Sequence, residues 1–163
     1  MANDLSIIIN QLEKLVNLKK DSKAITSSDI EQHIGISKEY NVFELQKAIA
    51  NKDLVKTTKI LNFVSSNPKA MAIQLITAML FSFFSKACVL YYEKKDQRKA
   101  AEAIGINPYY IQDYTQAVSK YQNKLPTIIS ILKEYDLKSK GVDSVSTDDS
   151  ELIKEMIFRI INL

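Results

Sequence analysis

The sequence predicts an all-α protein of about nine helices, divided into a small unit at 1–40 and a larger one at 41–163. Hydrophobic residues make up 46% of the 163 residues and charged residues 25%, the balance of a soluble globular protein. Only three glycines and three prolines occur, so the chain has few sites for tight turns. Apolar residues recur at three- and four-residue steps, and no stretch alternates as a strand does.

The first helix is expected over about 4–18, with Asn3 or Asp4 as its N-cap, because their side chains accept from unpaired backbone N–H groups. Its buried face is predicted to comprise Leu5, Ile8, Ile9, Leu12, Leu15 and Val16. A polar loop follows, and Thr26 or Ser27 then caps a short helix that stops at Gly35. The polar connector at 36–41 is the predicted domain boundary.

Three helices open the larger unit. The first is expected over 42–50, and the second begins near Asp53 and ends before Pro68. Because proline fits the first turn of a helix and not its interior, Pro68 is also expected to open the third helix, which runs to about Lys94.

That third helix is long and apolar between residues 70 and 92. Gln74, Ser82, Ser85 and Lys86 interrupt it, and no uninterrupted apolar run approaches the ~18 residues of a membrane span. A helix that is apolar on nearly all sides is otherwise the buried centre of a soluble protein. We therefore predict a buried central helix and no membrane association.

The remaining helices follow from their caps. Asp96 can cap a short helix that ends at Gly105, residues 107–108 start a helix to about 121, and Pro126 starts one to about 140. The last helix, capped by Asp149 or Ser150, is expected to bury Leu152, Ile153, Met156, Ile157, Ile160 and Ile161.

The chain offers no recognisable catalytic chemistry. Its single cysteine, Cys88, lies in the apolar helix and is expected to be a core residue, and its single histidine, His33, is expected to be a surface or cap residue. The acids at 148–151 are interpreted as helix-start charge. Three isolated glycines cannot form a phosphate-binding loop. The sequence therefore predicts no catalytic residue, no cofactor and no metal, which disfavours a small helical enzyme.

Nothing at the start of the sequence has the basic and then apolar pattern of a signal peptide, and one cysteine cannot form an intrachain disulfide. A cytoplasmic location is therefore expected.

A helix-turn-helix pattern at 97–121 gives an alternative function, sequence-specific DNA binding. The exposed candidates on its second helix are Tyr109, Gln112, Asp113, Gln116 and Lys120. Residues 41–140 are basic, with fourteen Lys and one Arg against eight acids, but these charges are scattered. Contacts to phosphate dominate affinity for DNA, and no arginine lies on this helix, so plain helix packing is the preferred interpretation.

Tyrosines gather in the second half of the chain, and they suit either the edge of a core or a protein interface. Both interpretations stay open. The candidate subunit-interface residues are Phe83, Tyr91, Tyr92, Tyr109, Tyr114 and Tyr135.

Four stretches in order resemble the delta subunit of DNA polymerase III, especially in Bacteroidetes-type bacteria. They are NDLS at 3–6 with NQLEKL at 10–15, ITSSDIE at 25–31 followed by IGISKEYNVFEL at 34–45, AEAIGINPY at 101–109, and DLKSKG at 136–141. Each stretch is weak alone, but the ordered set is more specific and covers nearly the whole chain.

The resemblance implies that 1–40 is a helical lid of the AAA+ type and that 41–163 is a clamp-loader collar domain. It implies a non-catalytic part of the polymerase holoenzyme that joins motor subunits and delta prime through the collar, with DNA met only within the complex. Family members carry an N-terminal AAA+-like domain that binds the sliding clamp, so this chain is expected to be a fragment. Ser6 stands where active relatives carry a nucleotide-sensing arginine, which implies no nucleotide binding.

Overall fold

The computed structural model describes residues 9–10, 12–17, 24–26, 40–67, 70–93, 97–142 and 148–163. The chain divides into two compact units, Met1–Asn41 and Val42–Leu163, which we describe separately. In the first unit the backbone is helical at 9–10 and 12–17 and irregular at 24–26. The expected second helix, Ser6 and His33 lie outside the described residues.

The predicted buried face of the first helix is wrong for three of its four described members. Leu15 is fully buried, but Ile9, Leu12 and Val16 are exposed. A unit of about forty residues has too little chain to cover several rows of side chains, because small domains bury a smaller fraction of their surface.

The larger unit is built from helices, and the all-α prediction is confirmed for the described residues, which contain no strand. They are α3 (Val42–Ala50), α4 (Leu54–Ser66), α5 (Ile73–Tyr92), α6 (Gln97–Ala103), the 3₁₀ turn η1 (Pro108–Tyr110), α7 (Ile111–Tyr121), the 3₁₀ turn η2 (Gln122–Lys124), α8 (Leu125–Ser139) and α9 (Asp149–Ile161). This part of the chain thus contains seven α-helices, fewer than the nine expected for the whole sequence.

Side-chain caps fix two of the predicted helix starts. The Asp53 carboxylate accepts from the Lys56 N–H at 2.9 Å, and the Asn107 side chain accepts from the Tyr109 N–H at 2.9 Å. Gly105 has a φ of +67°, the left-handed conformation that ends α6 and favours glycine. The turn between α6 and α7 is therefore formed as the sequence predicts.

Two helix starts differ from the predictions. Helix α5 begins at Ile73 and not at Pro68, because residues 70–72 are irregular and delay the first turn. Helix α9 begins at Asp149 with Asp148 as its N-cap, one residue before the earlier of the two expected caps. The Asp148 carboxylate accepts a hydrogen bond from the Ser150 hydroxyl, so Ser150 supports the cap and does not provide it.

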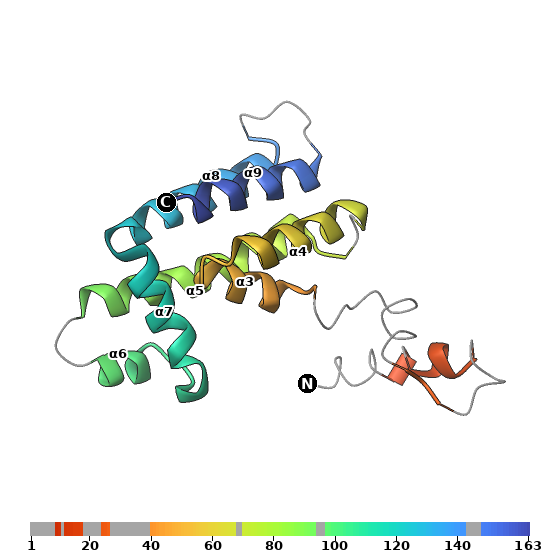
Figure 1. The fold of residues 1–163 in the computed structure, drawn as a ribbon, viewed down its shortest axis with the longest axis horizontal. Coiled ribbons are helices and arrows are strands. Elements are labelled where there is room, and N and C mark those ends of the chain that lie inside the picture. The colour runs from red at the N-terminus through yellow and green to blue at the C-terminus, as the bar shows by residue number, and fades with distance from the viewer. Residues whose placement is uncertain are drawn as a thin grey trace. The chain divides into compact units, whose positions relative to one another are not determined.

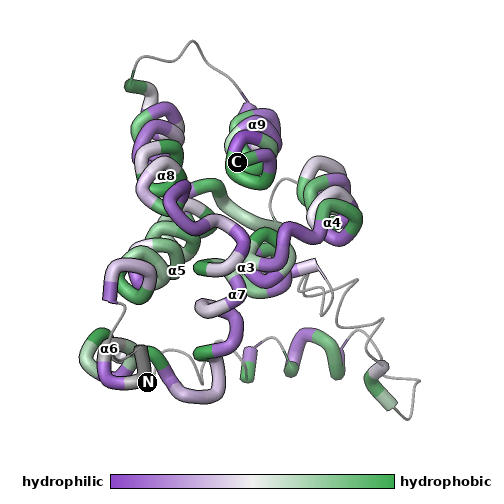
Figure 2. Tube along the Cα trace, turned by 60° about the vertical axis from the view of Figure 1, so that its left-hand side comes forward, coloured by the Kyte–Doolittle hydropathy of each residue, from purple (hydrophilic) through white to green (hydrophobic). Residues whose placement is uncertain are grey.

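Helix α5 is the centre of the larger unit. It contacts α8 and α7 most extensively and also contacts α3, α6 and α9. In Figure 1, α7 runs steeply across α5 while α8 and α9 lie side by side. Hydrophobic colours predominate along α5 in Figure 2. The fully buried Phe84, Ala87 and Leu90 anchor this core, whereas Cys88 is only half-buried and is not the core residue that was expected.

By length and composition α5 would also suffice to cross a membrane, and 44% of its most hydrophobic stretch is buried inside the protein. A central helix of a soluble protein meets the same criterion. Its extensive contacts with α7 and α8 favour the central-helix interpretation.

Candidate protein-binding surfaces

The described residues contain no group of three or more His, Cys, Asp and Glu side chains that could hold a metal ion. Burial raises the pKa of the Cys88 thiol, which disfavours the thiolate that a cysteine nucleophile needs. The prominent features of this unit are surfaces on which apolar side chains remain exposed.

The most extensive of these surfaces lies on α5. On the side opposite the core, α5 leaves uncharged and mostly apolar residues exposed at 74–75, 78, 81–82, 89 and 92, and none between 83 and 88. We call this surface the α5 ridge, and it comprises Leu75, Ala78, Phe81, Ser82, Val89 and Tyr92. Contiguous apolar surface of this kind marks protein interaction sites in soluble proteins.

The ridge is almost free of charge. Lys86 is the only charged residue among the 20 of α5, and its Nζ donates to the Gly105 carbonyl at 3.4 Å. Beside the ridge, Phe81 lines a depression of about 330 Å³ between α5 and α8. Lys133 and Asp136 border that depression, and Asp136 is paired with Lys140 at 2.6 Å.

The tyrosines predicted for a subunit interface separate into two groups. Tyr92 and Tyr109 are exposed, whereas Tyr91 and Tyr114 are half-buried. Phe83 stacks on Tyr114, with ring centroids 4.5 Å apart. Phe83 itself is buried, as is Tyr135.

Burial corrects the interface prediction for Phe83 and Tyr135. Both rings pack between helices, and Phe83 also lines the cavity between α3, α5 and the turn before α7. For the exposed and half-buried tyrosines, a role in an interface stays a prediction. Adjacent aromatic residues of one helix point to different sides, and periodicity alone did not separate those sides for an apolar helix.

Tyr135 lies beneath a charged cluster that joins α8 to α9. The Arg159 guanidinium donates to both Glu134 carboxylate oxygens, at 2.8 and 2.9 Å, and Lys138 pairs with Glu134 at 2.8 Å. Arg159 and Lys138 also lie over the Tyr135 ring, 5.5 and 4.6 Å from its centroid. Hydrogen bonds from Arg159 and Lys138 hold the pKa of Glu134 below its usual value. The cluster is a structural clamp between the two helices.

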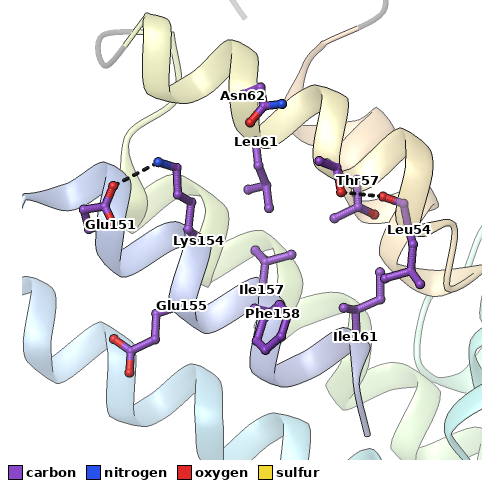
Figure 3. A pocket seen from close by; sticks show the side chains of 11 residues that line it. Leu54, Thr57, Leu61, Asn62, Glu151, Lys154, Glu155, Ile157, Phe158 and Ile161 are labelled. Atoms are coloured by element: carbon purple, nitrogen blue, oxygen red, sulfur yellow. Dashed lines mark hydrogen bonds and ion pairs between the residues drawn. The ribbon is translucent and has the colours of Figure 1, made fainter.

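A groove of about 470 Å³ runs between α4 and α9 (Figure 3). Leu61 and Ile157 point toward each other across it, and Phe158 on its border is 67% exposed. The Thr57 hydroxyl in its wall is buried and has no hydrogen-bond partner. Glu151 and Lys154 form an ion pair at 2.9 Å, and Glu155 gives the lining one net negative charge.

The helix-turn-helix formed by α6 and α7 packs as predicted, with Ile106 buried against Leu90 and Ala101. A cavity of about 510 Å³ lies between its turn, α3 and α5. Helix α7 carries one acid, Asp113, and one base, Lys120, so its charges cancel. A neutral helix is a poor reader of DNA, because contacts with phosphate supply most of the affinity. The geometry favours helix packing.

The α5 ridge is not apparent from the sequence alone. The available signal is that α5 has one charge in 20 residues, so any side that its neighbours leave uncovered is an uncharged surface. The exposed positions Leu75, Phe81 and Val89 become apparent only once the packing side of α5 is known.

The class of protein is therefore an all-helical unit whose prominent features are exposed apolar surfaces and grooves. The chain belongs to the family of the DNA polymerase III delta subunit, C-terminal domain, whose model matches residues 39–159. The resemblance to the delta subunit that the sequence predicted is thus confirmed, and its Bacteroidetes character stays a prediction.

Among solved structures the chain is similar to the Bacillus subtilis DNA clamp loader delta protein (YqeN), with a TM-score of 0.60 and 22% sequence identity. The similarity covers 98% of this chain and 47% of that protein, so the chain spans about half the length of this relative. At this identity the likeness concerns the fold. The search of curated proteins gave no match.

Proposed function

We propose that this chain is an assembly part of the delta subunit of a replicative clamp loader. In this proposal, residues 41–163 are the collar domain, and 1–40 are a small lid-like unit. The collar joins the motor subunits and delta prime, and the complex acts in the cytoplasm. Contact with the sliding clamp belongs to the N-terminal domain found in longer members of the family, and DNA is met within the complex.

The proposal assigns no catalytic activity to the chain. Helical faces and shallow grooves dominate the described surface of the larger unit, and these bind other proteins well because they supply area on rigid elements. The proposal aligns Ser6 with the nucleotide-sensing arginine of active relatives, which agrees with a subunit that binds no nucleotide. The chain then contributes to clamp loading by holding its neighbours in place.

The observation that carries the proposal is the family match over residues 39–159, which includes nearly all of the larger unit. The family is that of a subunit, and a subunit works together with partners. The exposed apolar surface of α5 gives those partners a place to bind. The fold shared with a clamp loader delta protein supports the same role.

Co-purification tests this function. The chain is mixed with the motor subunits and delta prime encoded by the same genome and separated by size-exclusion chromatography with light scattering. We expect one complex that contains this chain in a fixed ratio. Separate elution of all components at micromolar concentrations would contradict the proposal.

A gel-shift titration with duplex DNA at several salt concentrations separates this proposal from the helix-turn-helix alternative. Direct binding of DNA would weaken steeply as salt rises. We expect no salt-sensitive shift from the chain alone, since α7 is neutral.

A further inference from the structure

Among the described residues of the larger unit, the α5 ridge is a long helix surface that no other helix covers and that contains no charged residue. The opposite side of α5 belongs to the core, where Ile76, Leu80 and Phe84 are buried against the surrounding helices. The ridge side instead presents Leu75, Phe81 and Val89 to solvent. These exposed apolar side chains have a hydrophobic cost in the free subunit, which a partner relieves.

Charge defines the partner that fits this surface. A charged side chain placed against the centre of the ridge would lose water without gaining an opposite charge, which is unfavourable. Cations lie only at the borders, where Lys86 and Lys133 stand. The matching surface is therefore an apolar, uncharged helix face, with acidic residues at its edge.

The area of the ridge favours a neighbouring clamp-loader subunit over a second copy of this chain as the partner. A helix of 20 residues is ~30 Å long and, with its side chains, about 10 Å in diameter. Half of the circumference over this length gives the ridge an area of roughly 450 Å². Stable interfaces bury about 800 Å² on each partner. The ridge supplies only about half of that area, which suits a subunit held by several neighbours better than an isolated two-fold dimer.

We propose that the α5 ridge packs against an uncharged helix face of another clamp-loader subunit. The Phe81 ring, at the depression between α5 and α8, lies at the centre of the contact, and acidic residues of the partner face Lys133. This inference rests on the proposed function and assigns the contact to one surface of the unit. It leaves the groove between α4 and α9 outside the contact.

A membrane is the other apolar environment that could cover α5. Crossing a bilayer would expose α5 to lipid on all sides and so would remove it from α3, α7 and α8, which bury its other half. The packing of the unit therefore favours a protein partner.

Single substitutions in the full chain test the inference. Phe81→Asp places a negative charge on the ridge, and Ala78→Arg adds a bulky cation there. Phe158→Asp makes the same change as Phe81→Asp on α9 and is the matched control. Because Ala78 and Phe158 are exposed, these two changes leave the core intact. Circular dichroism and thermal unfolding show which variants keep the wild-type fold, and Ala78→Arg serves if Phe81→Asp does not fold.

Binding to the motor subunits and delta prime is then measured by surface plasmon resonance. We expect folded ridge variants to weaken Kd at least tenfold and Phe158→Asp to change it less than twofold. Wild-type affinity in folded ridge variants would overturn the inference, as would binding of the wild-type chain to lipid vesicles instead of subunits. If the wild-type chain binds no subunit, the proposed function itself fails, which is a distinguishable result.

Discussion

At the scale of single residues, one residue type serves opposite purposes in this chain. Tyr121 is 1% exposed, and its hydroxyl donates to the Ile49 carbonyl at 2.7 Å, which ties α7 to the end of α3. Burial raises its pKa, so the phenol stays protonated and keeps donating. Tyr109 is 84% exposed. The sequence predicted a tyrosine-rich seam, but it could not assign each ring to the core or the surface, because that depends on which helix covers it.

Replacing Tyr121 by Phe should lower the free energy of unfolding by about 1 kcal/mol, the usual value of one buried hydrogen bond. The loss is not larger because the Ile49 carbonyl also accepts from the Lys52 N–H at 2.9 Å. Urea unfolding of the full chain measures the change. The matched variant Tyr109→Phe should unfold as wild type, and equal behaviour of the two variants would contradict the assigned role of the hydrogen bond.

At the scale of elements, the sequence predicted most helices well because each has a local signal. Asp53, Gly105 and Asn107 mark helix ends through short-range hydrogen bonds and backbone conformation, which are properties of a few residues. The start of α5 was misplaced because its N-cap, Ala72, makes no side-chain hydrogen bond that the sequence could reveal. The cap of α9 was misplaced because Asp148, Asp149 and Ser150 are all residue types that cap helices. The ion pairs between α8 and α9 join residues 25 apart in sequence, and spacing alone does not reveal such contacts.

The α8–α9 clamp predicts a dependence on pH. Because Arg159 and Lys138 lower the pKa of Glu134, the folded state favours its carboxylate. The stabilisation is fully present above the unfolded pKa of about 4.3 and is lost as pH falls through the lower folded value. Glu134→Gln should therefore reduce Tm at pH 7 and have less effect near pH 3.

At pH 7, Glu134→Gln should lower the free energy of unfolding by roughly 0.5 kcal/mol. The effect is small because the Glu134 side chain is 40% exposed and water screens its ion pair with Lys138. Thermal unfolding of wild type and variant across this pH range gives the measurement. Glu102→Gln, at an exposed position of α6, is the control. If the destabilisation caused by Glu134→Gln grew as the pH fell, the result would contradict the clamp assigned to Glu134, Lys138 and Arg159.

At the scale of the whole molecule, the chain comprises two compact units that meet at residues 41 and 42. The family match lies almost entirely in the second unit. The sequence indicated a boundary there through its polar connector, but composition gave no information about which surfaces stay uncovered. Exposure depends on how all the helices pack together, and this is why the α5 ridge was found only in the structure.

A chain limited to residues 42–163 should fold without the first unit, because α3 to α9 form their own core. We expect a single sigmoidal urea transition with a midpoint close to that of the larger unit in the full chain. Circular dichroism at 222 nm follows this transition. A broad, non-cooperative transition would show that the first unit is needed for the core to form.

The uncovered side of α5 also bears on how much of this chain a cell can tolerate. Copies made in excess of their neighbours would keep a bare apolar strip in water, where such strips adhere to one another and attract chaperones and proteases. We therefore expect the abundance of this chain to follow the supply of the proteins that shield it, with surplus copies removed by degradation.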